Sequence, residues 1–299
     1  MATQRTRTDQ EMLDLILRIA QEEDRIRAVI LNGSRTDPRT PGDLFQDFDI
    51  LYIVTELESF IPDASWPGRF GDLAILQRPD DMDITGAGRR PAVPRKSYAW
   101  LMQFRDGRRI DLTAVLADDR ERLLRDSLRV LLLDKDGLFP PFPTPDDRAY
   151  HVPAPTAKQF DDCCNEFLWV SPYVAKGLWR GETVYVRETL EQLVRPQLLR
   201  MLSWHAGMRH GYAVSIGSYH KKLESLLDPS LRRMLGRTWP DARPEQVWDA
   251  LLTMGRLFRR AAGEVAASAG FTYPEEDHRR VTALLRRIRH LPRDAERIY

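Results

Sequence analysis

One stretch, residues 31–54, constrains the fold most, because it places a turn and two carboxylates between short apolar runs. The first run leads into the Gly33-Ser34 turn, and the second begins at an Asp-Phe-Asp triplet. Since side chains alternate along a strand, Asp47 and Asp49 are expected on one face, roughly 6 to 7 Å apart. Two carboxylates at that spacing repel each other unless a cation lies between them.

A divalent metal ion suits this arrangement. Mg²⁺ is typically bound by one or two carboxylates together with the phosphates of a substrate. The Gly33-Ser34 turn offers backbone N–H groups and a hydroxyl to a phosphate. The alternative is a solvated strand edge that carries two Asp residues by chance. The Gly-Ser-Arg sequence upstream favours the metal and phosphate interpretation.

Composition bounds the class of protein. At 299 residues the chain can form two domains with a large core. Charged residues make up 30% of the chain but balance to a formal net charge of +1, which argues against a nucleic-acid surface built on overall charge. The two cysteines are adjacent, so we expect no disulfide framework. The polar N-terminus and the absence of a long apolar run predict a cytoplasmic globular protein without a membrane span.

Secondary-structure patterns change near residue 150. Before it, the pattern predicts helices at residues 10–23, 56–61 and 118–129, and Asp9 is expected to cap the first of them. Strands are predicted at residues 27–31, 47–54, 73–77, 98–105, 108–116 and 130–133. An irregular loop is expected at residues 79–96. Six prolines from residue 140 to residue 155 indicate a linker. Beyond it the pattern predicts only helices, at 156–180, 183–210, 218–227, 229–235, 244–269 and 275–291.

A third carboxylate lies in a predicted hairpin. Asp106-Gly107 joins two apolar-rich runs and is a strong hairpin signal. In the second arm, Asp111 is expected to face away from its apolar neighbours. A carboxylate in an inner strand is costly unless it is paired or binds a metal. Asp111 is therefore either half of a structural ion pair or a partner of Asp47 and Asp49 in a metal site.

The predicted helix at 156–180 carries a second pattern. Acidic, aromatic and basic side chains recur at helical spacing on one face, at Asp162, Glu166, Trp169, Tyr173 and Lys176. Such a face suits a polyhydroxylated, cationic ligand with a phosphate nearby. The alternative is an ordinary amphipathic helix with a charged outer face. Lys221, after Gly217-Ser218, is either a further phosphate contact or a solvated surface lysine.

These motifs resemble the polymerase-β-type nucleotidyltransferase superfamily and, more closely, the aminoglycoside 6-adenylyltransferases, often called streptomycin adenylyltransferases. The matching segments are Asn32-Gly33-Ser34-Arg35, Gln46-Asp47-Phe48-Asp49-Ile50, Asp106-Gly107-x-x-Ile110-Asp111-Leu112-Thr113, Leu132-Leu133-Asp134-Lys135-Asp136-Gly137, Cys163-Cys164-Asn165-Glu166-Phe167 and Ser171-Pro172-Tyr173-Val174-Ala175-Lys176-Gly177-Leu178. The resemblance implies an α+β chain. A mixed-sheet nucleotidyltransferase domain, residues 1–150, would precede an all-α helical-bundle domain for substrate binding, residues 151–299, with the active site between them.

The resemblance also implies a reaction, the transfer of AMP from ATP to an aminoglycoside hydroxyl with release of pyrophosphate. The expected acceptor is the 6-hydroxyl of streptomycin, so the protein would confer antibiotic resistance. Two Mg²⁺ ions bound by Asp47, Asp49 and Asp111 would hold the attacking and leaving oxygens in line. Glu166 is the candidate general base, with Asp111 as the metal-assisted alternative.

The remaining roles follow from the same resemblance. The residues expected at the nucleotide are Gly33, Ser34, Arg35, Lys176 and Lys221. Those expected at the aminoglycoside are Asp162 and Glu166, which would pair with its cationic groups, and Trp169 and Tyr173, which would stack on a sugar face. One departure is Ser218, which stands where family members tend to carry Lys.

Two other functions remain open at this point. One is a ligand-binding relative without catalysis, against which the three carboxylates argue. The other is a nucleotidyltransferase that acts on a protein, for which the acidic and aromatic helix face would not be needed. ATP and an aminoglycoside are the expected partners, with neither nucleic acid nor membrane, and a monomer is slightly favoured.

Overall fold

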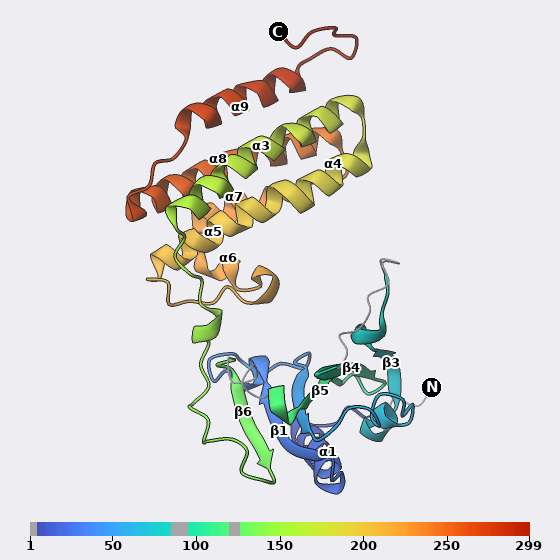
Figure 1. The fold of residues 1–299 in the computed structure, drawn as a ribbon. Helices are drawn as coiled ribbons and strands as arrows, with labels where there is room; N and C mark the ends of the chain where they lie inside the picture. Colours follow the sequence, from blue (N-terminus) through green and yellow to red (C-terminus); the bar gives the residue numbers. More distant parts are fainter. Residues whose placement is uncertain (1–4, 85–94, 120–125) are drawn as a thin grey trace. The chain divides into compact units, whose positions relative to one another are not determined.

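The computed structural model describes residues 5–84, 95–119 and 126–299 (Figure 1). The chain forms two compact units, Met1–Ala149 and Tyr150–Tyr299. The first contains a mixed six-stranded sheet and the second contains helices, so the α+β prediction is confirmed. Among the described helices, none combines the length and apolarity needed to cross a lipid bilayer.

The sheet of the first unit has the strand order β3-β4-β5-β2-β1-β6. Its strands are β1 Ile26–Asn32, β2 Phe48–Val54, β3 Leu73–Gln77, β4 Ser97–Phe104, β5 Arg109–Leu116 and β6 Arg129–Asp134. All six strands were predicted, and β4 and β5 form the hairpin that Asp106-Gly107 indicated. β2 and β5 pair in parallel, whereas the other neighbours are antiparallel.

The two faces of the sheet are covered differently. On one face, helix α1 (Asp9–Glu22) packs against alternate residues of the central strands, including Phe48 and Ile50 of β2 and Ile110 and Leu112 of β5. On the other face, a smaller cluster joins Ala28, Ile30, Ile53 and Val115 to Phe139 of the segment after β6. Because side chains alternate, the carboxylates of β2 and β5 lie on this second face.

The start of α1 differs from the prediction. Thr8, not Asp9, is the N-cap, because its extended backbone lets its hydroxyl accept from the Glu11 N–H while Glu11 accepts from the Thr8 N–H. Asp9 is thereby free to pair with two arginines, Arg35 at 2.7 Å and Arg108 at 2.8 Å. The helix start is thus tied to the Gly33–Thr36 turn through Arg35 and to the β4–β5 hairpin through Arg108.

The helix predicted at residues 56–61 does not form. Pro62 disfavours helical backbone at the residue before it, and the carboxylates of Glu56 and Glu58 bond to nearby backbone N–H groups instead. A 3₁₀ helix follows at Trp66–Phe70. More than half of the predicted 79–96 loop and half of the predicted 118–129 helix lie outside the described residues. The described part of the latter begins in a 3₁₀ turn, Ala117–Asp119, and ends at the first residue of β6, Arg129.

The second unit is a helical bundle around one core. Its helices are α3 Ala157–Arg180, α4 Thr183–Thr189, α5 Arg195–Arg209, α6 Leu223–Leu226, α7 Pro229–Gly236, α8 Pro244–Ala269 and α9 Glu275–Arg289 (Figure 1). The predicted helix at 183–210 is interrupted by a π-helical turn, Leu190–Val194, in which the Arg195 N–H donates to the Leu190 carbonyl. Pro196 has no N–H to donate to the preceding turn, and the π-helical turn ends two residues before it.

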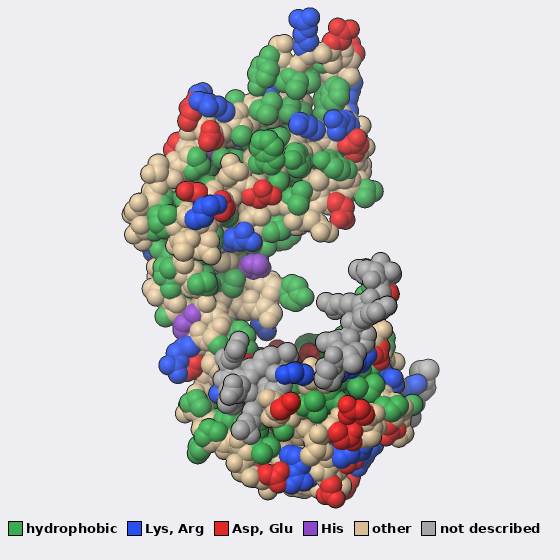
Figure 2. All heavy atoms as spheres, viewed as in Figure 1, with side chains coloured by type: hydrophobic (Ala, Val, Ile, Leu, Met, Phe, Trp, Pro, Cys, Tyr) green, Lys and Arg blue, Asp and Glu red, His purple; other side chains and the backbone are tan. Residues whose placement is uncertain are grey.

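The distribution of charged side chains on the surface is consistent with the near-neutral net charge of the chain. On the face shown in Figure 2, basic and acidic side chains alternate over each unit without separating by sign. Hydrophobic side chains lie between them on the helical unit. Cys163 and Cys164 are buried in the helical core as free thiols.

Candidate active site

The register of two parallel strands brings the predicted carboxylates together. Asp49 of β2 and Asp111 of β5 are direct partners across the strand pair. Neighbouring strands lie about 4.8 Å apart, so the two side chains emerge side by side on one face. On the other side of β2, Asn32 of β1 is the partner of Asp49. Asp47 lies in the segment that enters β2.

The carboxylate of Asp49 leaves no room for a side chain at position 33. The φ of Gly33 is +76°, and a Cβ at this position would lie 2.3 Å from Asp49 Oδ2. Its N–H donates to the Leu128 carbonyl at 3.0 Å, so it holds the turn to the segment before β6. The half-buried Ser34 side chain forms no hydrogen bond within the described part of the chain. Within the predicted phosphate-binding turn, the Ser34 hydroxyl is therefore a donor that no described residue engages.

Arg35 holds the approach to Asp47 in place. Its guanidinium donates to the carbonyls of Asp47 and Gln46, each at 2.8 Å, and pairs with Asp9. It also stacks on the Phe48 ring at 3.7 Å, and its side chain is only 9% exposed. These contacts give Arg35 a positioning role at Asp47. Its predicted contact with a triphosphate remains a prediction.

Crowding perturbs the ionisation of these carboxyl groups. Burial, followed by the charges of Asp111 and Asp47, raises the pKa of Asp49 from 3.8 to about 6. Burial also raises the pKa of Asp47, although the nearby Arg109 charge opposes this rise. Both shifts mean that the site disfavours its own negative charge. A cation placed among the carboxylates would relieve this cost.

Arg109 supplies such a cation in this structure. Its Nε donates to Asp111 Oδ1 and its Nη2 to Asp111 Oδ2, each at 2.8 Å, and Nε lies 3.5 Å from Asp47 Oδ2. Across the described ranges, no three His, Cys, Asp or Glu side chains are arranged to hold a metal ion. Asp47, Asp49 and Asp111 thus share one region of the sheet, but Arg109 holds two of them, and the metal site stays a prediction.

The donor atoms nevertheless fit Mg²⁺ in kind. Carboxylate and carbonyl oxygens are its preferred protein ligands. Beside the three carboxylates, Asn32 Oδ1 is buried and accepts no hydrogen bond from the described residues. A buried oxygen without a donor is costly, and a cation or donor near it would lower that cost. The sequence signal for Asn32 was its position at the strand end, one residue before the turn.

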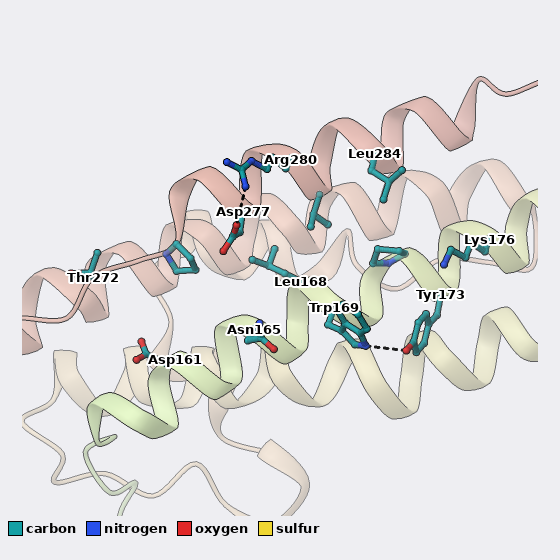
Figure 3. A pocket seen from close by; sticks show the side chains of 13 residues that line it. Asp161, Asn165, Leu168, Trp169, Tyr173, Lys176, Thr272, Asp277, Arg280 and Leu284 are labelled. Atoms are coloured by element: carbon teal, nitrogen blue, oxygen red, sulfur yellow. Dashed lines mark hydrogen bonds and ion pairs between the residues drawn. The ribbon is translucent and has the colours of Figure 1, made fainter. Parts of the chain in front are cut away.

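In the second unit, part of the predicted helix face lines a pocket of about 680 Å³ between α3 and α9 (Figure 3). Trp169, Tyr173 and Lys176 contribute to its wall, and Trp169 Nε1 donates to the Tyr173 hydroxyl at 3.0 Å. Its remaining lining mixes polar and apolar side chains from α3, from α9 and from the segment before α9. These residues are Asp161, Asn165, Leu168, Pro172, Thr272, Pro274, Asp277, Arg280, Val281 and Leu284.

The acidic part of the predicted face lies elsewhere. Asp162 pairs with Lys158 on the helix surface, and neither Asp162 nor Glu166 lines the pocket. The pocket is lined instead by Asp161 and Asn165, each one position earlier, because α9 packs over that side of α3. The spacing of Asp161, Asn165 and Trp169, four residues apart, was the available signal. Glu166 is half-buried and has no ion-pair partner in the described segments.

The predicted nucleotide ligands are divided between the units. Gly33, Ser34 and Arg35 belong to the first unit, and Lys176 and Lys221 to the second. Lys221 follows a tight turn in which a Cβ on Gly217 would lie 2.8 Å from its Cγ. Lys176 is exposed at the edge of the α3–α9 pocket.

The profile of the streptomycin adenylyltransferase family matches residues 6–288. The chain belongs to this family. It is 38% identical over 273 residues to the aminoglycoside 6-adenylyltransferase of Bacillus subtilis (strain 168), covering 91% of this chain and 94% of that protein. It is 39% identical over 276 residues to the Campylobacter jejuni protein of the same name, covering 91% and 93%.

A solved structure is also similar. The crystal structure of an aminoglycoside 6-adenyltransferase from Bacillus subtilis is 33% identical in sequence, covers 95% of this chain and 100% of that one, and gives a TM-score of 0.47. The relatives are nucleotidyltransferases, so this family member is an enzyme of that class. The predicted family is confirmed.

The contact between Gly33 and Asp49 predicts a specific loss in Gly33→Ala. The new Cβ would displace the Asp49 carboxylate, so we expect nucleotidyl transfer to fall by about two orders of magnitude. Gly137→Ala is the matched control, because Gly137 has φ +66° and a Cβ there would meet no atom within 4 Å. Both variants should lose about 1 to 2 kcal/mol of folding stability from backbone strain. Equal turnover in the two variants would contradict the assigned role.

The raised pKa of Asp49 predicts that replacing this carboxyl group with a neutral one stabilises the protein in a pH-dependent way. Between pH 3.8 and about 6 the native carboxyl keeps its proton more than the unfolded one, so native stability falls as pH rises through this window. Without divalent ions, Asp49→Asn should be more stable than the parent by about 1 to 3 kcal/mol near neutral pH, with no gain below about pH 4. Urea unfolding at both pH values measures the difference.

Asp136→Asn provides a control of opposite sign. The Arg27 guanidinium lowers the pKa of Asp136, so its removal should destabilise the protein at neutral pH and have little effect in acid. An Asp49→Asn gain of equal size at both pH values would show that packing, not charge, is responsible.

Proposed function

We propose that this protein transfers AMP from ATP to a hydroxyl group of an aminoglycoside and releases pyrophosphate, with the 6-hydroxyl of streptomycin as the expected acceptor. The relatives that match most of the chain are named aminoglycoside 6-adenylyltransferases. The observation that carries the proposal is the register pairing of Asp49 with Asp111, beside the Gly33-Ser34 turn.

In this reaction, the acceptor oxygen forms a bond to the α-phosphorus of ATP while the bond to the pyrophosphate oxygen breaks. The acceptor proton must pass to a base, and negative charge develops on the leaving group. Mg²⁺ bound by Asp47, Asp49 and Asp111, with Asn32 Oδ1 nearby, would supply Lewis-acid stabilisation of that charge, with two ions expected. The protein contributes the placement of these oxygens on adjacent, rigid strands.

Glu166 is the preferred general base. It is half-buried and unpaired among the described residues, so a carboxylate is available to accept a proton. Asp111 is the alternative, but both of its oxygens accept hydrogen bonds from Arg109. Asp111 would have to release one of these hydrogen bonds before that oxygen could take the acceptor proton.

The triphosphate would be bound by the Ser34 hydroxyl and by Lys176 and Lys221. Arg35 would contribute through the backbone of Asp47, because most of its donors are already used. The α3–α9 pocket suits part of the acceptor. Trp169, with 65% of its surface exposed, offers an aromatic face to a sugar ring or a cationic group.

The charged side chains of the pocket wall also suit an aminoglycoside. Asp161 is exposed and forms no ion pair among the described residues, so it can receive an ammonium or guanidinium group of an aminoglycoside. On α9, Asp277 and Arg280 are paired with each other at 3.9 Å. Asp162, predicted at the acceptor, is engaged by Lys158 and would have to exchange that partner.

The decisive experiment incubates the protein with ATP, Mg²⁺ and single aminoglycosides and detects one added AMP by mass spectrometry. We expect modified streptomycin, and we expect Asp49→Asn and Asp111→Asn to reduce its formation by roughly two to three orders of magnitude while remaining folded. AMP on the protein with unmodified drug would indicate a protein acceptor. No transfer to any acceptor would indicate a binding protein without catalysis.

A kinetic comparison separates binding from proton transfer. Trp169→Leu should raise KM for the aminoglycoside by about tenfold or more with a small effect on kcat, because it removes a contact made in the ground state. Glu166→Gln should lower kcat by roughly 10²- to 10⁴-fold with a small effect on KM.

Trp239→Leu is the control for Trp169, because Trp239 is an exposed tryptophan of the same unit outside the pocket. Unchanged KM in both tryptophan variants would remove the α3–α9 pocket from the acceptor site. Normal kcat in Glu166→Gln would transfer the role of base to Asp111.

A further inference from the structure

We propose that Arg109 is a built-in counter-ion that competes with the divalent cation for Asp111 and Asp47. The guanidinium binds both Asp111 oxygens in parallel at 2.8 Å and reaches within 3.5 Å of Asp47 Oδ2. It therefore occupies the carboxylates at which the proposed function places the metal, and the inference rests on that part of the proposal.

The pair is local and will form without help from other segments. Arg109 and Asp111 are separated by one residue on β5, so both side chains emerge on the same face of the strand. A fork of two parallel N–H bonds is the strongest arginine–carboxylate geometry. The backbone of Asp111 is fixed by its register with Asp49 on β2, so the fork has a defined position.

Arg109 and a metal ion are alternatives at this site. Mg²⁺ binds carboxylate oxygens at about 2.0 to 2.1 Å, and a guanidinium on the same two oxygens would bring two positive centres close together. In a partly buried site that repulsion is poorly screened. The cation that enters must therefore displace Arg109 from at least one oxygen.

Arg109 is placed so that it can leave. Its side chain is 39% exposed, and within the described part of the chain its hydrogen bonds go only to Asp111. Arg35, on the other side of Asp47, is the contrasting case. It is 9% exposed and bonded to two backbone carbonyls, so it remains fixed while Arg109 exchanges.

The fork between Arg109 and Asp111 has a function in the enzyme before the divalent cation binds. Three carboxylates crowd this face, and the Arg109 charge lowers their mutual repulsion before a cation arrives. Arg109 thus acts as a positioning residue, since it keeps Asp111 in place beside Asp49. The cost of this support is weaker binding of the metal, because each binding event must first break the fork.

The test measures Mn²⁺ binding to the full chain by electron paramagnetic resonance, without ATP or aminoglycoside, in the parent and in Arg109→Gln. We expect the variant to bind Mn²⁺ roughly three- to tenfold more tightly, as loss of a competing charge-assisted hydrogen-bond pair implies. Its melting temperature without metal should fall, and saturating Mn²⁺ should restore it to that of the metal-saturated parent. Arg109→Lys, which keeps the charge but loses the fork, should lie between the two.

Arg27→Gln is the matched control, because Arg27 forms an arginine–carboxylate fork with Asp136 away from the carboxylate cluster. It should lose stability without any change in Mn²⁺ affinity. Equal affinity in the parent and Arg109→Gln, or weaker affinity in the variant, would overturn the inference alone. Absence of Mn²⁺ binding in both would overturn it together with the metal site, whereas the mass-spectrometric assay tests AMP transfer separately.

Discussion

Repulsion between carboxylates on neighbouring strands is the constraint on which the first unit depends. The parallel pairing of β2 with β5 leaves Asp49 and Asp111 no freedom to separate along the sheet. Each nearby feature limits the resulting cost: Gly33 leaves room for Asp49, and Arg109 binds Asp111. Burial of apolar side chains in the large core on the opposite face offsets the free-energy cost of this arrangement. A charged site of this kind requires a rigid sheet, not a flexible loop.

Much of this arrangement was predictable from local signals. Asp106-Gly107 located a hairpin, and period-two alternation placed Asp111 on the face away from the core. The parallel contact of β2 with β5 was not predictable, because the strands are distant in sequence and no turn specifies their register. The same holds for the pocket. Which face of α3 it uses depends on where α9 packs, and this is why Asp161, not Asp162, lines it.

The arginines around the site divide into two kinds, and their burial distinguishes them. Arg35 and Arg108 are almost fully covered and converge on Asp9, where α1 begins, so they tie the helix start to the turn and to the hairpin. Arg109 is more exposed, and its guanidinium forms ion pairs with Asp111 and Asp47. Sequence alone treats the three as equivalent positive charges. Arg35 and Arg108 donate to backbone carbonyls and are structural, whereas Arg109 is the arginine that we propose to exchange.

The α3–α9 pocket has a further consequence for inhibitor design. All of its lining residues belong to two helices and the segment that precedes the second of them, within one unit. A compound that fills it would therefore contact residues of the helical unit alone. Because the wall combines aromatic rings with Asp161 and Lys176, such a compound would carry an apolar part for the rings, a cationic group for Asp161 and an anionic group for Lys176.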